Sequence, residues 1–159
     1  MRRGEVPRPV GGCVRILIAN GPNLSQLGHR APDVYGTATM ADIVAAVRRV
    51  HDDIDDFITE SEGELITRLH RARTDGTAAV VINAGALTHY SYALRDAIEL
   101  IDLPTVEVHL SQIAARETFR HGSVISAVVD VTITGAGAYG YELAVLAARH
   151  LVAARHGAR

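Results

Sequence analysis

The chain has 159 residues, of which 48% are hydrophobic and 21% are charged, and its formal net charge is −2. This length suits one domain with a sizeable core, and the small net charge disfavours nucleic acid as a partner. No apolar stretch reaches the roughly 20 residues of a membrane helix, and the single cysteine, Cys13, allows no intrachain disulfide. We therefore expect a globular protein of the reducing cytoplasm, with no membrane partner.

Lysine is missing from the sequence, because all 16 residues counted as lysine or arginine are arginines. A mechanism through a Schiff base needs a lysine amine, and a Walker-type phosphate loop needs its own lysine. Both classes of protein are excluded.

Apolar runs alternate with helical patterns along the chain, which predicts βαβ units and a parallel sheet. We expect residues 1–13 to be a disordered extension and residues 14–159 to form one three-layer α/β domain. In chain order, the predicted elements are a strand at 14–19, a helix at 40–50, a weak strand within 51–58, a helix at 62–73, a strand at 79–82, a helix at 92–101, a strand at 105–109, a polar loop with helical parts at 111–120, a strand at 126–133 and a helix at 139–154.

Two helix starts carry capping signals, and one segment is unusually acidic. Thr39 is a plausible N-cap of the first helix, and Ser61 followed by Glu64 is a capping-box pattern for the second. The acidic segment Asp52–Asp56 is predicted to be solvated rather than to bind a cation.

Polar residues follow the predicted strands at the points where they end. They are Asn20 and Asn23 after the first strand, Asn83 after the third, and Glu107, His109 and Ser111 around the end of the fourth. Alternation at i, i+2 and i+4 puts Glu107 and His109 on one face of a strand. A carboxylate raises the pKa of a neighbouring imidazole and fixes its tautomer, which suits a general acid, although an ordinary structural histidine is the alternative.

Two further patterns resemble a nucleotide-binding site and a metal site. Gly135–Gly140 matches G-x-G-x-x-G, but the dinucleotide fingerprint needs a further strand and an acidic residue about 20 positions on, so we expect a tight strand-to-helix turn. A metal site is conceivable, although no ligand spacing such as H-E-x-x-H supports it. Its ligands would be His89, Glu107, His109 and His121.

Taken together, the motifs resemble those of the type II 3-dehydroquinases. Eight blocks occur in the family's order: Asn20–Leu24, Arg30 to Tyr35–Gly36, Glu62–Ile66, Asn83–His89, Ala93–Asp96, Glu107–Ser111, Arg116–Arg120 and Gly135–Tyr141. The resemblance covers nearly the whole chain. It implies a flavodoxin-like fold whose five-stranded parallel sheet has the order 2-1-3-4-5, no cofactor or metal, and a homo-oligomer that is commonly a dodecamer of four trimers.

The resemblance also implies an activity, the dehydration of 3-dehydroquinate to 3-dehydroshikimate through an enolate. Tyr35 would be the base, and because a phenol with a pKa of about 10 is a poor base at neutral pH, cations must lower it. Arg30, in a mobile loop, and Arg116 are the matching cations. Asn23, through a bound water, would stabilise the enolate, and His109, oriented by Glu107, would protonate the departing hydroxyl.

Binding roles carry over in the same way. Leu110 and Ser111 would bind the substrate carboxylate through backbone N–H groups, and Asp96 would reach the site of a neighbouring subunit. Asn83, His89 and Arg120 would hold the ring hydroxyls. The alternative is a catalytically silent ligand-binding or regulatory protein with the same fold. The sequence is compatible with aromatic biosynthesis and with quinate breakdown, because both use this reaction.

Overall fold

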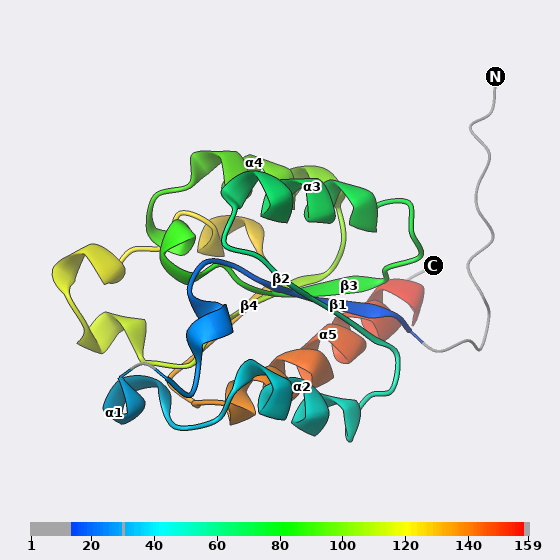
Figure 1. Cartoon of the computed structure of the whole chain (residues 1–159). Helices are drawn as coiled ribbons and strands as arrows, with labels where there is room; N and C mark the ends of the chain where they lie inside the picture. Colours follow the sequence, from blue (N-terminus) through cyan, green and yellow to red (C-terminus); the bar gives the residue numbers. More distant parts are fainter. Residues whose placement is uncertain (1–13, 30, 158–159) are drawn as a thin grey trace.

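Five strands form one parallel sheet in the order β2-β1-β3-β4-β5 in the computed structural model, which describes residues 14–29 and 31–157 (Figure 1). The strands are β1 (Ile16–Asn20), β2 (Ile54–Ile58), β3 (Ala79–Asn83), β4 (Thr105–His109) and β5 (Val131–Thr134). The predicted strand order and the parallel α/β class are confirmed. The predicted extension, residues 1–13, lies outside the described residues, as does Arg30.

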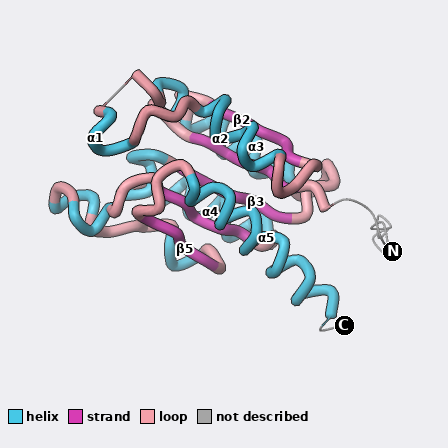
Figure 2. Tube along the Cα trace, turned by 90° about the horizontal axis from the view of Figure 1, so that it is seen from below, coloured by secondary structure: helices cyan, strands magenta, loops and turns pink. Residues whose placement is uncertain are grey.

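Helices cover both faces of the sheet, which gives three layers (Figures 1 and 2). The helices are α1 (Pro32–Tyr35), α2 (Met40–Arg48), α3 (Glu62–Ala72), α4 (Tyr92–Ile101) and α5 (Tyr139–Gly157). Apolar side chains of α2 and α5 pack on one face, and those of α3 and α4 pack on the other. Because β1 and β3 are buried on both faces, their sequences are apolar up to the final asparagine, each large buried side chain contributing about 1.5–3 kcal/mol. β4 is buried as well, but its two valines alternate with polar residues, Thr105, Glu107 and His109.

The helix starts follow the capping signals, with one correction. Thr39 forms a complete capping box with Asp42. At the start of α3 only half of the predicted box forms, because the Ser61 hydroxyl accepts from the backbone N–H of Glu64, while the Glu64 carboxylate accepts from the Thr59 hydroxyl. The side chain of Glu64 therefore ties α3 to the end of β2 instead of capping its own helix.

Two predicted elements near the carboxyl end of β4 are shorter than expected. The segment predicted as a strand at 126–133 starts with a 3-10 turn, Ser126–Val128, and only Val131–Thr134 pairs with β4. Two hydrogen bonds of Ser126 explain this difference. Its hydroxyl donates to the buried Glu107, and its backbone N–H donates to the Ser123 hydroxyl. The polar segment 111–120 forms two 3-10 turns, Ile113–Ala115 and Thr118–Arg120.

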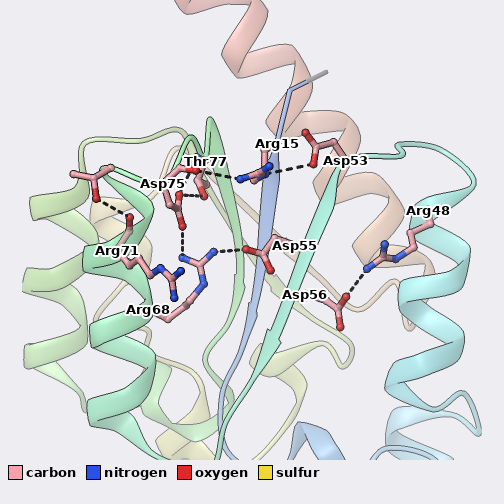
Figure 3. Close-up of polar contacts among 10 residues, drawn as sticks. Arg15, Arg48, Asp53, Asp55, Asp56, Arg68, Arg71, Asp75 and Thr77 are labelled. Atoms are coloured by element: carbon pink, nitrogen blue, oxygen red, sulfur yellow. Dashed lines mark hydrogen bonds and ion pairs between the residues drawn. The ribbon is translucent and has the colours of Figure 1, made fainter. Parts of the chain in front are cut away.

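The acidic segment forms a full edge strand. β2 pairs with β1 along five residues, from Ile16 opposite Ile54 to Asn20 opposite Ile58. Three carboxylates of the acidic segment, two within β2 and Asp53 just before it, are paired with arginines from different parts of the chain, rather than only solvated as predicted (Figure 3). These pairs are Arg15–Asp53 at 3.5 Å, Arg48–Asp56 at 2.5 Å and Arg68–Asp55 at 2.5 Å. Alternation along the strand sends Asp55 toward α3 and Asp56 toward α2.

Arg68 is the most buried of these arginines, with a relative exposure of 8%. Besides Asp55, its guanidinium pairs with Asp75 at 3.1 Å. Burial raises the pKa of Asp75, but hydrogen bonds from Thr77 and the nearby guanidinium outweigh burial, so that this pKa lies below its ordinary value. Arg68 thus joins α3, the edge strand and the turn before β3 through ionised partners.

We expect the variant Arg68→Met to lower the free energy of unfolding by about 2–3 kcal/mol, because Asp55 and Asp75 lose a charged hydrogen-bond donor. The measurement is urea denaturation followed by circular dichroism. The matched control is Arg48→Met, which breaks a pair whose side chains are 47% and 46% exposed and should cost less than about 1 kcal/mol. Equal losses for the two variants would contradict a special role of Arg68.

Candidate active site

A pocket opens at the carboxyl ends of β1, β3 and β4, the edge at which parallel sheets bind ligands. Nine residues selected from the sequence line it: Asn23, Tyr35, Asn83, His89, His109, Leu110, Ser111, Arg116 and Arg120. Apolar and small residues complete the wall and were not selected: Pro22, Leu24, Leu27, Gly85, Ala86 and Ile113. Figure 1 shows α1 and the 113–120 segment at the same end of the molecule, beside this edge.

Tyr35 and Arg116 meet across the pocket although 81 positions separate them. Nη1 of Arg116 donates to the Tyr35 hydroxyl oxygen at 2.7 Å, and the guanidinium carbon lies 5.2 Å from the centre of the tyrosine ring. The same nitrogen lies 3.3 Å from the Ser111 hydroxyl oxygen. A permanently charged donor at this distance would stabilise negative charge on the phenol oxygen.

His109 and Glu107 share one face of β4, as the alternation predicts. His109 Nε2 lies 2.7 Å from Glu107 Oε1, and the Glu107 side chain is fully buried behind the pocket. Hydroxyl groups supply the remaining donors to the carboxylate: Ser123 at 3.0 Å, Thr132 at 3.3 Å, and Ser126. Burial raises the pKa of Glu107, but the hydrogen bonds from His109 and Ser126 outweigh burial, and the pKa is lower than usual.

This arrangement fixes the tautomer of His109. An ionised carboxylate only accepts hydrogen bonds, so Nε2 of His109 carries a hydrogen and donates it to Glu107. Nδ1 is then the ring nitrogen that can take up or release a proton on the pocket side. The serine and threonine partners of Glu107 were not predicted from the sequence, because they lie 16, 19 and 25 positions away along the chain and only the fold brings them to the carboxylate.

Asn23 is held in place by a carboxylate that the sequence analysis did not select. Its backbone has a positive φ of 68°, and its N–H donates to Glu60 Oε2 at 2.7 Å. The Ser25 hydroxyl donates to the other oxygen of Glu60 at 2.5 Å, and these two bonds lower the pKa of Glu60. Glu60 therefore fixes the turn after β1 from the end of β2.

On the far wall of the pocket, an exposed aromatic ring supports two cationic or polar side chains. Nδ1 of His89 donates to the Gly122 carbonyl at 2.7 Å, and its ring meets Phe119 edge-on at 6.1 Å. Arg120 lies over the same ring at 4.6 Å and donates to Glu117 at 2.9 Å. His89 and Arg120 thus face the pocket with their other ends already engaged.

The glycine motif shapes the site through its backbone. Gly135 and Gly137 have φ values of +81° and +59°, a region that favours glycine. The N–H of Gly137 donates to the Leu110 carbonyl at 3.0 Å, and that of Gly135 donates to the Ser111 carbonyl at 3.2 Å. The prediction of a strand-to-helix turn is confirmed, and the turn holds the backbone segment that follows β4.

Comparison with known proteins decides the family. Residues 14–149 match the family described as Dehydroquinase class II. The chain belongs to this family. A 3-dehydroquinate dehydratase from Jannaschia sp. is 54% identical over 138 residues, covering 84% of this chain and 93% of that protein. A catabolic 3-dehydroquinase from Botryotinia fuckeliana is 49% identical over 137 residues, covering 82% and 89%.

Solved structures agree with this class II dehydroquinase assignment. The type II dehydroquinase from Butyrivibrio crossotus has a TM-score of 0.85 at 36% identity and covers 87% of this chain and 99% of its own. The enzyme from Propionibacterium acnes has a TM-score of 0.79 at 43% identity, with coverage of 89% and 99%. The predicted flavodoxin-like fold and the resemblance to type II 3-dehydroquinases are confirmed.

Two residues selected from the sequence do not line the pocket of this dehydroquinase-family chain. Glu107 lies behind His109, and Asp96 is exposed on α4. Arg30 falls outside the described residues. Among the described residues, no group of three or more His, Cys, Asp or Glu side chains is placed to hold a metal ion, the weighed set around Glu107 and His109 included. No described helix is long and apolar enough to span a membrane.

We expect Ser126→Ala to destabilise this family member by about 1–2 kcal/mol at neutral pH, because the buried Glu107 loses a donor. The lost bond favours the carboxylate, so the variant raises the pKa of Glu107 toward its ordinary value of 4.5. The difference in unfolding free energy between the wild-type protein and the variant should be largest above pH 4.5. It should shrink as the pH falls through the lowered pKa of Glu107, below which this carboxyl group is protonated in both proteins. Urea denaturation across this pH range measures it.

The matched control for that experiment is Ser25→Ala, which removes the same group from the exposed carboxylate of Glu60. It should change stability less at every pH, because water replaces the lost donor. A Ser126→Ala effect that stayed constant from neutral to acid pH would contradict the assignment of an ionised Glu107.

Proposed function

We propose that this chain converts 3-dehydroquinate to 3-dehydroshikimate and water, with Tyr35 as the base and His109 as the acid. The observation that carries the proposal is one pocket that holds both a phenol with a guanidinium donor on its oxygen and an imidazole backed by a buried carboxylate. Three relatives named 3-dehydroquinate dehydratase match over 84–87% of this chain, which supports 3-dehydroquinate as the substrate.

The first step is removal of the proton next to the ketone by the Tyr35 oxygen, and the electron pair of the C–H bond moves into an enolate. The guanidinium of Arg116, 2.7 Å from that oxygen, supports the phenolate that must act as the base. Arg30 is proposed as a second cation in this role. Asn23 stabilises the enolate oxygen through a bound water.

In the second step the enolate re-forms the ketone and expels the β-hydroxyl, which takes a proton from Nδ1 of His109 and leaves as water. The buried Glu107 holds Nε2 at 2.7 Å, so the protonated ring keeps a charge partner while it faces the substrate. One proton is taken and one is given, so the reaction balances with the chain's own residues and needs no cofactor or metal.

The remaining polar groups bind the substrate. Backbone N–H groups of Leu110 and Ser111 bind its carboxylate, supported by the glycine turn that holds their carbonyls. Asn83, His89 and Arg120 hold the ring hydroxyls. Each of these side chains already makes a hydrogen bond within the protein, which limits its rotation before substrate binds.

We further propose that the chain works in the cytoplasm as a homo-oligomer, a dodecamer of four trimers, in which Asp96 reaches the site of a neighbouring subunit. The exposed face of α4 supports this, since Tyr92, Asp96 and Leu100 are spaced four residues apart on one side of the helix. Tyr92 and Leu100 are 68% and 52% exposed, so a neighbouring subunit on this side of α4 would bury two large side chains together with Asp96.

We expect Tyr35→Phe to lower kcat by at least about 100-fold with little change in substrate binding, because only the ionisable oxygen is lost. The ultraviolet absorbance of the conjugated enone product follows the reaction. Tyr139→Phe, which removes the same hydroxyl from an exposed tyrosine outside the pocket lining, is the control. Turnover near the wild-type rate in Tyr35→Phe would contradict the base assignment.

The same assay separates this function from its rivals. Wild-type activity should survive borohydride treatment in the presence of substrate, since the chain has no lysine to form an imine. Absence of product from the folded, assembled wild-type protein would favour a catalytically silent binding protein instead.

We expect Asp96→Ala to lower kcat/KM at least about tenfold in the assembled protein, because a charged hydrogen bond to the neighbouring site is lost. Glu99→Ala removes an exposed carboxylate from the same helix and is the matched control. Size-exclusion chromatography checks that both variants assemble. Wild-type activity in assembled Asp96→Ala, or equal activity of isolated folded subunits, would contradict a shared site.

A further inference from the structure

Tyr141 is a fully buried tyrosine for which the proposed chemistry has no use. It lies near the start of α5, which crosses the sheet in Figure 1, and its side chain has no measurable exposure. Its hydroxyl donates to Asn20 Oδ1 at 2.7 Å and accepts from Asn83 Nδ2 at 2.9 Å. Both asparagines are buried, and Asn83 lines the pocket.

The hydrogen bonds run in one direction through these three residues. The single hydroxyl hydrogen of Tyr141 goes to Asn20, so the hydroxyl oxygen can only accept from Asn83. Burial raises the pKa of Tyr141 far above its ordinary value, so the hydroxyl stays a neutral donor at every working pH. The Asn83 carbonyl oxygen in turn accepts from the Gly85 N–H at 3.2 Å. Both ends of the Asn83 amide are therefore assigned.

The position of Tyr141 depends on close contact between α5 and the sheet. Asn20 and Asn83 end adjacent strands and are paired in the β1–β3 register, so one hydroxyl can reach both. Gly140 precedes Tyr141, and a Cβ there would lie 3.3 Å from Val108 Cγ2. This contact is tighter than most Cβ contacts, so the glycine lets α5 approach β4 closely next to Tyr141.

We propose that Tyr141 is a positioning residue, which locks the Asn83 amide so that its second N–H faces the pocket and binds a substrate hydroxyl. This inference rests on the proposed function, in which Asn83 binds the substrate. Two partners distinguish the present orientation of the amide from the flipped one, the Gly85 N–H at its oxygen and the tyrosine oxygen at its nitrogen. Without the tyrosine oxygen only the longer of the two bonds, that from Gly85, still opposes the flip that would turn the carbonyl oxygen toward the pocket.

The test is Tyr141→Phe, which removes only the hydroxyl. We expect KM for 3-dehydroquinate to rise about tenfold while kcat changes less than about threefold, because one binding donor is misplaced and the base and acid are untouched. Val145→Ala, a truncation on the same helix in the same core cluster, is the control for general loosening. A KM change no larger than that of Val145→Ala would overturn the proposal.

A double-mutant cycle with Asn83→Ala tests the route of the effect. If Tyr141 acts through Asn83, then Tyr141→Phe adds no further rise in KM in the Asn83→Ala background. A full additional rise would overturn the proposal.

Nuclear magnetic resonance of the Asn83 side-chain amide gives a readout that does not depend on activity. In the wild-type protein, the amide proton bonded to Tyr141 should exchange with solvent far more slowly than those of the exposed Asn23, and Tyr141→Phe should speed its exchange. Rapid exchange in the wild-type protein would overturn the lock even if no variant folds. Slow exchange in a wild-type protein without dehydratase activity would instead uphold the lock and reject the proposed function.

Discussion

The carboxylate of Glu107 is the group on which the rest of the site depends. It is fully buried within β4, between two strands and under helices, where an ionised group without partners would be very costly. The fold meets this cost with four donors, His109, Ser123, Ser126 and Thr132, drawn from β4, the following turns and β5. Because the donors bond to both oxygens, the carboxylate is held in one orientation, and its bond to His109 fixes the orientation of the imidazole ring.

The need for these donors explains the shape of the chain before β5. Residues 122–126 cannot extend as a strand, because two of their hydroxyls must turn inward to the carboxylate. The same short segment also offers the Gly122 carbonyl to His89 and the Val124 carbonyl to Arg95 of α4. One irregular segment thus links the acid pair, a wall of the pocket and the helix that carries Asp96. A substitution that breaks one of these contacts is expected to alter the others, because residues 122–126 make all of them.

The sequence predicted those parts of the fold whose causes are local. The strand 105–109 and the helix 92–101 have the predicted bounds, because the hydrophobic patterns that define them act over a few residues. The strand within 126–133 was wrong over its first half, since Ser126 bonds to a residue 19 positions away. The acidic edge strand gave a weak signal because its stabilising arginines come from three other elements. Tyr141 escaped selection for the same reason, as its partners lie 121 and 58 positions away.

The unusually acidic composition of β2 leaves the candidate site intact. None of the residues that line the pocket comes from β2, although Glu60 just beyond it fixes the backbone of Asn23. The two acidic side chains of β2, Asp55 and Asp56, pair with arginines of α3 and α2, and Asp53 just before the strand pairs with Arg15 just before β1 (Figure 3). The strand keeps its full register with β1, so the position of Asn20 and the turn after it is preserved. Substitutions in β2 are therefore expected to act on stability through these ion pairs, whereas substitutions at the ends of β1, β3 and β4 act on the pocket itself.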